Sequence, residues 1–405
     1  MDQVGVPANE LLAELDRRRA TEPDVHGARL FGLVYPTGRD DVEDLVLEVQ
    51  RRYLFHNALN PFKFPEIAAL EREVVTMTSD LLNLSGDGGG SMTSGGTESI
   101  LMSMLVNRER ARARGIERPQ ILAPHSAHPA YAKAAHYFGM EHVQVPIDAD
   151  WRADVAAAAK LIGPSTAVVV ASAFTYPHGV MDPVADLAAL AAEHGAGCHV
   201  DACIGGFVLP FLERLGHDVP PWDFRVDGVT EISADVHKYG YVPKGASVVL
   251  HRDADWSQHQ VFLYDQWPAG IYGSPAIGGA RPAAPIAVAW AVMRYLGVDG
   301  YTEMMRGVME TASRVRAAVE SIPEVEIVSA PIGPVLCMHS ESIDLYAVAD
   351  VMDAKGWNLN RNVEPRGVHL MLSPAHANVV DELIADLIDA VAHHGTAKDG
   401  QARYS

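Results

Sequence analysis

The middle of the chain alternates short apolar runs with helical stretches, and this alternation constrains the fold more than any other feature. Residues 166–173 form a continuous apolar run rich in β-branched side chains, and a second run at 197–201 is typical of another strand buried on both faces. A helix is predicted between them, opened by Asp182-Pro183 and running to Glu193, because proline is favoured in a first helical turn. Such strand–helix–strand units of about 30 residues predict a mostly parallel α/β sheet.

The chain divides by character into three predicted parts. Residues 1–65 contain one helical stretch, at 40–53, and are interpreted as an N-terminal arm. Residues 66–285 carry the alternation and are predicted to form a large α/β domain, and residues 286–405 a small C-terminal α+β domain. The other predicted elements of the large domain are helices at 66–84, 98–114 and 129–138, strands at 120–123 and 142–146, and a glycine-rich loop at 85–96. Those of the small domain are helices at 285–296, 301–322 and 379–393 and strands at 325–328, 335–338 and 368–372.

The charge balance and the cysteines exclude some classes of protein. The chain has 52 acidic and 32 basic residues, a formal net charge of −20, which argues against a nucleic-acid partner and disfavours anionic membranes. No apolar run approaches the roughly 20 residues that a membrane span requires, and residues 1–16 lack the features of a signal peptide. Three cysteines without a CxxC pair suggest a reducing compartment, so we expect a cytoplasmic protein.

Two residues suggest a specific chemistry. Lys238 follows a histidine and precedes an apolar run at 246–250, and Asp201 ends a predicted buried strand, where open α/β sheets bind their ligands. A buried lysine amine can condense with an aldehyde, and a buried aspartate can hold a pyridine nitrogen protonated. Together these groups predict a site for pyridoxal phosphate. A surface lysine and a turn-capping aspartate are the ordinary interpretations of either residue alone. We further expect burial among bulky neighbours to lower the pKa of Lys238.

A glycine-rich segment, Ser94-Gly95-Gly96-Thr97-Glu98-Ser99, opens a predicted helix and could bind an anion there, although a plain helix cap is the alternative. It has neither the Walker spacing nor a dinucleotide fingerprint. The histidines show no metal-binding spacing, so no metal site is predicted. Ser126 and His128 could belong to a hydrolase, but the chain has no GxSxG elbow.

These segments together resemble the sphingosine-1-phosphate lyases and their bacterial relatives, within the group II pyridoxal-phosphate-dependent decarboxylases. The resemblance extends from Val34 to His376. The matching segments are Phe64-Pro65, 92–100 (Met-Thr-Ser-Gly-Gly-Thr-Glu-Ser-Ile), 127–129 (Ala-His-Pro), 199–207 (His-Val-Asp-Ala-Cys-Ile-Gly-Gly-Phe), 235–245, 279–282 (Gly-Ala-Arg-Pro) and 356–360 (Gly-Trp-Asn-Leu-Asn).

The resemblance implies a fold, an oligomeric state and a role for each matching residue. It implies the fold of type I pyridoxal-phosphate enzymes and a homodimer. The implied cofactor-binding roles are an imine bond to Lys238, a pyridinium partner in Asp201, a stacked ring in His128, and phosphate contacts from Gly96, Thr97, His237 and, near a partner subunit, Gly279. Lys244 and Tyr35 would bind the phosphate of the substrate, and Lys238 or Tyr35 would return a proton to carbon.

Two positions depart from the family pattern. Asn60 stands where the lyases commonly carry a histidine that helps to hold the substrate phosphate, so a hydrogen-bond donor remains without a positive charge. Ala280 stands where they tend to have a serine, which removes one hydroxyl from the segment near the cofactor phosphate.

The predicted function is retro-aldol cleavage of a small-molecule amine: a phosphorylated amino alcohol, either a sphingoid base phosphate or a smaller soluble analogue, would yield an aldehyde and phosphoethanolamine. The alternative is an L-amino-acid decarboxylase, with Arg361 or Arg366 as its carboxylate anchor. A protein that binds without catalysing would be expected to have lost Lys238 or Asp201, and both are present. Aminotransfer is chemically open, but the matching segments do not favour it.

Overall fold

A seven-stranded sheet organises the computed structural model, which describes residues 4–397 and 402. Its strand order is β1-β7-β6-β5-β4-β2-β3, and every strand is parallel to the others except β7, which is antiparallel to both neighbours. The strands are β1 (Gly89–Thr93), β2 (Gln120–Pro124), β3 (Glu141–Val145), β4 (Thr166–Ser172), β5 (Gly197–Asp201), β6 (Glu231–Ala234) and β7 (Ser247–His251). The predicted mostly parallel α/β sheet is therefore confirmed.

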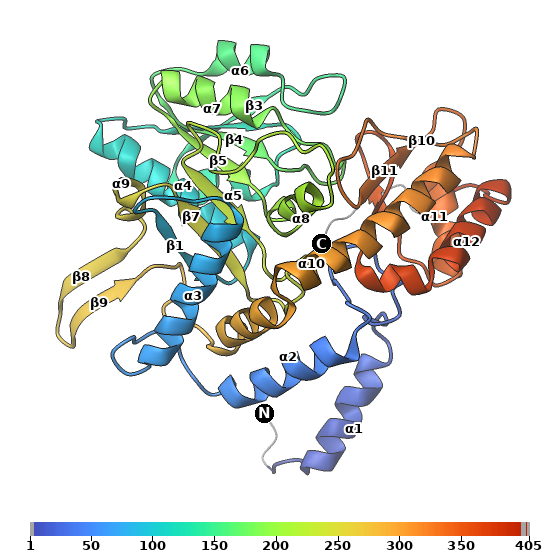
Figure 1. Ribbon diagram of the computed structural model, residues 1–405, viewed down its shortest axis with the longest axis horizontal. Coiled ribbons are helices and arrows are strands. Elements are labelled where there is room, and N and C mark those ends of the chain that lie inside the picture. The colour runs from blue at the N-terminus through green and yellow to red at the C-terminus, as the bar shows by residue number, and fades with distance from the viewer. Residues whose placement is uncertain (1–3, 398–401, 403–405) are drawn as a thin grey trace.

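Helices surround this sheet in the ribbon view (Figure 1). They are α3 (Pro65–Leu81), α4 (Gly96–Ala113), α5 (Ala130–Phe138), α6 (Val155–Leu161), α7 (Val184–Glu193), α8 (Leu209–Arg214) and α9 (Ala254–Ser257). Every residue of β4 and β5 is buried, as expected for strands covered on both faces. The carboxyl ends of β5 and β6 and the amino end of α4 bring the residues around Asp201, Lys238 and Gly96 to one edge of the sheet.

Two strands of this sheet were not predicted. β1 lies within residues 85–96, which the sequence indicated to be a loop, and that prediction is wrong. A Cβ added at Gly90 would lie 1.8 Å from the carbonyl oxygen of Val249, so glycine allows β1 to approach β7 closely. β6 is only four residues long and contains Glu231 and Ser233, so it lacks the long apolar run by which a buried strand is recognised.

A smaller antiparallel sheet forms the C-terminal part of the chain, with strand order β10-β11-β13-β12. Its elements are β10 (Glu326–Ile327), β11 (Val335–His339), β12 (Asn360–Asn362), β13 (Gly367–Met371), α11 (Leu345–Ala354) and α12 (Val380–Ala392). The long helix α10 (Ala284–Glu320) connects this sheet to the large one (Figure 1). It consists of the two helices predicted at 285–296 and 301–322, which meet at a kink at Gly297 (φ 56°). The predicted small α+β unit is therefore present, although its exact boundary stays a prediction.

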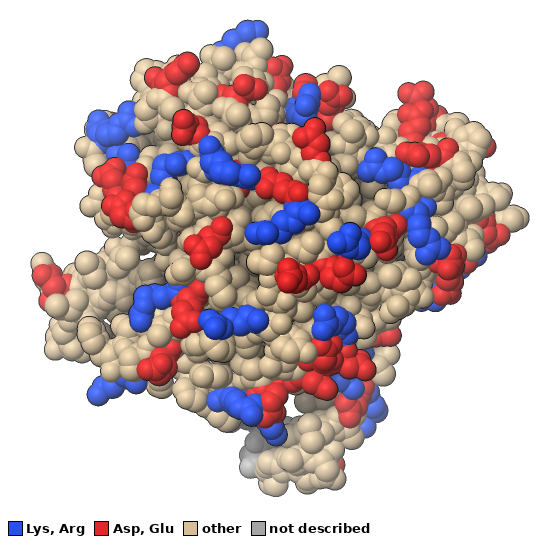
Figure 2. All heavy atoms as spheres, viewed as in Figure 1, with Lys and Arg blue, Asp and Glu red and all other residues tan. Residues whose placement is uncertain are grey.

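The N-terminal segment contains α1 (Ala8–Arg19) and α2 (Asp40–Tyr53), of which only α2 was predicted. α2 packs against α10, whereas α1 has no buried residue and projects from the body (Figure 1). A two-stranded hairpin of β8 (Phe262–Trp267) and β9 (Gly270–Ser274), also not predicted, projects on another side. On the face shown in Figure 2, acidic and basic side chains are interspersed. In the described part of the chain, no helix has both the length and the apolar character needed to cross a membrane.

Candidate active site

A cavity of about 390 Å³ lies at the edge of the large sheet and contains almost the whole predicted site. The predicted residues that line it are Tyr35, Gly96, Thr97, His128, Asp201, His237, Lys238 and Lys244. They come from the N-terminal segment, the start of α4, the end of β5 and the loops that follow β2 and β6. Residues that are distant in sequence therefore meet at one place, as the topology of an open α/β sheet predicts.

Asp201 ends β5 and is 8% exposed, so its carboxylate is at the floor of the cavity. One of its oxygens, Oδ1, accepts the backbone N–H of Cys203 at 3.1 Å. Burial, together with the charge of Asp201, raises the pKa of the nearby Tyr131 hydroxyl well above its usual value. Tyr131 therefore remains a protonated, neutral phenol beside the carboxylate. The arrangement leaves Asp201 suited to pairing with a cationic ring nitrogen.

Lys238 lies in the turn after β6, and its Nζ is 3.0 Å from Oδ2 of Asp235. Burial alone would lower the pKa of this amine, but the carboxylate of Asp235 outweighs burial, and the pKa is raised well above its usual value. The predicted depression of the Lys238 pKa is therefore wrong. An opposite charge at contact distance stabilises the ammonium more than lost hydration destabilises it.

Asp235 is the main residue that the sequence analysis did not identify. It is 2% exposed, and its Oδ2 also lies 3.6 Å from Nε2 of His237. Burial nevertheless lowers the pKa of His237 to about 4, so the ring is neutral near pH 7. The signal was present in the sequence: Asp235 precedes Lys238 by three residues, a spacing that brings side chains together across a turn.

The start of α4 forms a second wall of the cavity. A Cβ added at Gly96 would lie 2.7 Å from Oδ2 of Asp235 and 2.8 Å from Sγ of Cys203, so only glycine fits beside them. The first backbone N–H groups of this helix, which is 18 residues long, have no partners within the helix and attract an anion. Thr97 at its start also lines the cavity. A phosphate group is the ligand that this wall suits.

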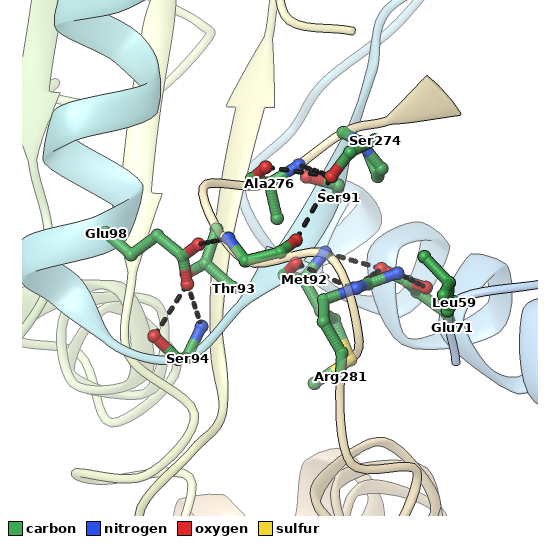
Figure 3. A network of polar contacts seen from close by, with 12 residues as sticks. Leu59, Glu71, Ser91, Met92, Thr93, Ser94, Glu98, Ser274, Ala276 and Arg281 are labelled. Atoms are coloured by element: carbon green, nitrogen blue, oxygen red, sulfur yellow. Dashed lines mark hydrogen bonds and ion pairs between the residues drawn. The ribbon is translucent and has the colours of Figure 1, made fainter. Parts of the chain in front are cut away.

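Glu98 fixes that helix start to a distant loop (Figure 3). Its Oε2 accepts the backbone N–H of Ser94 at 2.7 Å and the Ser94 hydroxyl at 2.6 Å, while its Oε1 accepts the N–H of Ile277 at 2.9 Å. In the same network Arg281 forms a bidentate ion pair with Glu71, at 2.7 and 2.8 Å (Figure 3). The guanidinium of Arg281 is thus occupied by this ion pair, which holds the loop in place.

Lys244 and Tyr35 lie together at the mouth of the cavity. Nζ of Lys244 is 4.7 Å from the centre of the Tyr35 ring and donates to the carbonyl oxygen of His237 at 3.3 Å. Although the side chain of Lys244 reaches the surface, the surrounding protein and the charge of Lys238 lower its pKa to about 8. The Tyr35 hydroxyl donates to Sδ of Met371 at 3.0 Å. This pair offers a cation and a phenol to a substrate that enters the cavity.

Two predicted site residues do not line the cavity of their own chain. Asn60 is exposed in the loop before α3, and its Oδ1 accepts the backbone N–H groups of Phe62 and Lys63 at 3.0 and 3.1 Å. Gly279 lies beside the β8–β9 hairpin, where an added Cβ would be 2.9 Å from the Tyr272 hydroxyl. Their predicted roles in phosphate binding stay predictions.

The two arginines proposed as carboxylate anchors are both occupied. Arg361 forms ion pairs with Asp350 and Asp353, each at 2.7 Å. Arg366 pairs with Asp344 at 3.0 Å, and its guanidinium lies 3.7 Å from the centre of the Tyr346 ring. Neither arginine offers an unpaired charge to a substrate carboxylate, so the structure does not support the expectation that one of them anchors an amino acid.

The cavity fits pyridoxal phosphate. It contains a lysine for the aldehyde and a buried aspartate for the ring nitrogen, and its glycine-bounded helix start suits the phosphate. His128 lies on the wall between these groups, and its Nδ1 accepts the N–H of Ala130 at 3.1 Å. Burial lowers the pKa of His128, which keeps the ring neutral and suited to stacking.

Comparison with known proteins agrees with this geometry. The family model of the pyridoxal-dependent decarboxylase conserved domain matches residues 40–340. Sphingosine-1-phosphate lyase 1 of Mus musculus is 39% identical over 390 residues, which cover 96% of this chain and 68% of the relative. Sphingosine-1-phosphate lyase of Arabidopsis thaliana is 40% identical over 390 residues, covering 94% and 72%.

Solved structures give the same result. The sphingosine-1-phosphate lyase of Burkholderia pseudomallei K96243 superposes with a TM-score of 0.93 at 38% identity, covering 97% of this chain and 92% of that one. Glutamate decarboxylase of Lactobacillus brevis, at a TM-score of 0.86 and 21% identity, covers 98% and 96% and shows the shared fold alone. The predicted fold, cofactor and enzyme class are confirmed. The chain belongs to the pyridoxal-phosphate-dependent decarboxylases and, among them, to the sphingosine-1-phosphate lyases.

Proposed function

We propose that the protein cleaves the carbon–carbon bond beside the amine of a phosphorylated long-chain amino alcohol, releasing an aldehyde and phosphoethanolamine. The observation that carries this proposal is the second lysine, Lys244, in the same cavity as Lys238. A carbon–carbon cleavage needs one lysine for the cofactor, and a phosphorylated substrate needs another cation. The similarity to sphingosine-1-phosphate lyases supports the same substrate class.

Each wall of the cavity has a distinct task in this reaction. When bound at Lys238, pyridoxal phosphate supplies an electron sink for the breaking bond. Asp201 would keep the ring nitrogen protonated, and Gly96, Thr97 and His237 would bind the cofactor phosphate. Lys244 and Tyr35 would bind the substrate phosphate and so orient the amine-bearing carbon toward Lys238.

Asp235 would control the protonation state of the Lys238 amine. The amine attacks an aldehyde only in its neutral form, whereas the contact of 3.0 Å between its Nζ and Oδ2 of Asp235 favours the ammonium form. Although burial alone would raise it, the pKa of Asp235 is lowered by the charge of Lys238, so this carboxylate stays charged and keeps the released amine protonated. As the aldehyde forms, the substrate hydroxyl loses its proton, and Lys238, or Tyr35 at the mouth, would give a proton to the carbon that remains.

We also propose that the enzyme acts as a homodimer in the cytoplasm. The β8–β9 hairpin exposes Phe262, Leu263, Trp267 and Ile271, an apolar group that favours burial against another chain. Gly279 lies beside this hairpin, outside the cavity of its own chain, so a second copy would bring it to the neighbouring site. Light scattering of the purified protein tests this: a mass of one chain at micromolar concentration would contradict it.

The substrate is tested with a matched pair of variants. Lys244→Gln removes the charge at the mouth, and Lys244→Arg retains it. For a phosphorylated amino alcohol we expect Lys244→Gln to lower kcat/KM by roughly 100-fold and Lys244→Arg to lower it much less, because a charged group loses its partner. Carbon dioxide release from amino acids is measured in parallel. Equal activity of both variants, or release of carbon dioxide without phosphoethanolamine, would favour the decarboxylase alternative.

A further inference from the structure

A second cavity, of about 340 Å³, lies beside the catalytic cavity and has no role in the reaction as proposed above. We call it the histidine cavity, because His125, His128, His178 and His369 line it. It shares Ser126, His128 and Tyr176 with the catalytic cavity, so the two meet along one wall. Any group that extends past His128 from the reacting atoms enters this space.

The catalytic cavity also adjoins a hollow at its other end. That hollow, of about 460 Å³, lies between the N-terminal segment and the loop of Lys244, and it shares Tyr35, His237 and Lys244 with the catalytic cavity. No described residue lines both this hollow and the histidine cavity. The catalytic cavity thus has two separate ends, one at Lys244 and one at His128.

Rings and aliphatic side chains form most of the wall of the histidine cavity. Trp151 stacks on His178 with ring centres 4.7 Å apart, and Tyr176 meets His369 edge-on at 4.5 Å. Ile147 adds aliphatic surface to the same wall. A wall of this kind favours a carbon chain over a strongly hydrated group.

Two neutral imidazoles in this wall have ring nitrogens without a hydrogen-bond partner among the described residues. Burial lowers the pKa of His369 to about 3 and also lowers that of His178. Nε2 of His178 is 2.8 Å from the carbonyl oxygen of Glu364, so this nitrogen carries the proton and Nδ1 is an acceptor. Among the described residues, that Nδ1 and both ring nitrogens of His369, which is 3% exposed, have no hydrogen-bond partner. One donor and two acceptors therefore remain unsatisfied, and a bound hydroxyl would lower the free-energy cost of leaving them so.

The charged residues of this wall are already paired. Arg361 binds Asp350 and Asp353, and Glu364 lies 3.1 Å from Nε2 of His125. Among the described residues that line the cavity, no lysine or unpaired arginine is present to hold an anion. The ligand that the wall suits is consequently uncharged, with a carbon skeleton and at least one hydroxyl.

We infer that the histidine cavity binds the aldehyde-forming part of the substrate and selects chains that carry a hydroxyl in addition to the one that becomes the aldehyde oxygen. This inference rests on the proposed function. In such a substrate the phosphate and the long chain extend to opposite sides of the amine-bearing carbon. With the phosphate at Lys244, the chain is directed to the opposite end, past His128, where His178 and His369 meet its hydroxyl.

The test compares two phosphorylated amino alcohols of equal chain length, with and without the additional hydroxyl, by release of phosphoethanolamine from the holoenzyme. We expect the wild type to prefer the hydroxylated substrate about 10-fold in kcat/KM, as one buried hydrogen bond provides. His369→Leu should abolish this preference by slowing the hydroxylated substrate alone. A general packing defect would slow both substrates equally and would overturn the assignment.

A second pair of variants tests the location independently of His369. Ile147→Trp fills the histidine cavity and should lower kcat/KM for long chains about 10-fold while sparing short ones. Leu47→Trp fills the hollow at the Lys244 end and should leave the chain-length profile unchanged. The reverse pattern would place the chain in that hollow and overturn the inference.

If the wild type released no phosphoethanolamine from any chain length, the proposed function itself would fail, whereas turnover without discrimination would refute the inference alone.

Discussion

Two lysines in one loop differ in their electrostatic environment although only six positions separate them. Lys238 lies deep in the cavity against Asp235, and its pKa is raised well above the usual value. Lys244 lies at the mouth beside Tyr35, has no comparable carboxylate contact among the described residues, and has a pKa lowered to about 8. Contact with Asp235 therefore distinguishes Lys238, the amine proposed to bind the cofactor, from Lys244, the cation proposed to bind the substrate phosphate.

The largest effect in this comparison is expected from Lys238→Ala. Loss of the nucleophilic amine should lower kcat by at least about 1,000-fold, because no other lysine of the described chain is positioned to replace it. Intact mass spectrometry after borohydride reduction should detect covalent cofactor in the wild type and none in the variant. Lys244→Ala serves as the matched control and should retain the covalent cofactor. Labelling of the Lys238→Ala variant would show that the wrong lysine has been assigned.

Asp235→Asn should have the next largest effect. It removes the carboxylate contact that distinguishes Lys238 from Lys244. Without this carboxylate, the strongest interaction that opposes the effect of burial on Lys238 is lost, so the pKa of Lys238 should fall. We expect faster capture of the cofactor near pH 7 but about 10-fold lower kcat, because the released amine is no longer held protonated to return a proton to carbon. Stopped-flow absorbance of cofactor binding measures the first effect. A variant in which capture and kcat slow together would instead show a structural defect.

A pH series tests Lys244 directly. Because the pKa is about 8, the side chain is charged below that pH and loses its charge as the pH rises through it. KM for a phosphorylated substrate should therefore rise above pH 8, whereas in Lys244→Arg it should remain flat to higher pH. Initial rates at several substrate concentrations measure this shift. An equal rise in KM for both proteins would assign the titration to another group.

The smallest expected effect is that of Tyr35→Phe. Its ring still lies beside Lys244, but the hydroxyl that would contact the substrate phosphate is lost. We expect a decrease of about 5-fold in kcat/KM, the scale of one partly exposed neutral hydrogen bond. Unchanged kinetics would remove Tyr35 from the site, whereas a decrease in kcat as large as that of Lys238→Ala would make it the proton donor to carbon.

Much of the fold was predictable because its buried strands carry unmistakable patterns. β4 carries a continuous apolar run and β5 follows it after one predicted helix, and this pattern is enough to place Asp201, at the end of β5, on the edge of the sheet. β1 was not predictable in the same way, because its glycines usually indicate a loop. Only the close approach to β7, with no room for a Cβ at Gly90, explains why they lie in a strand.

The site was predictable in its residue types but not in its electrostatics. Lys238 and Asp201 were identified from chemistry and position, yet the sign of the Lys238 pKa shift depends on a 3.0 Å contact with Asp235 that the sequence does not reveal. Likewise, the sequence allows Arg361 as an anchor for a substrate carboxylate, whereas the fold places Asp350 and Asp353 against it. Burial and partners across the fold decide such cases.

The most direct test of the central claim is the product balance of the wild-type holoenzyme. Incubated with a phosphorylated long-chain amino alcohol, it should release phosphoethanolamine and a long-chain aldehyde in equal amounts, both quantified by mass spectrometry. Release of carbon dioxide from an amino acid, with neither product formed from the phosphorylated amine, would contradict the account.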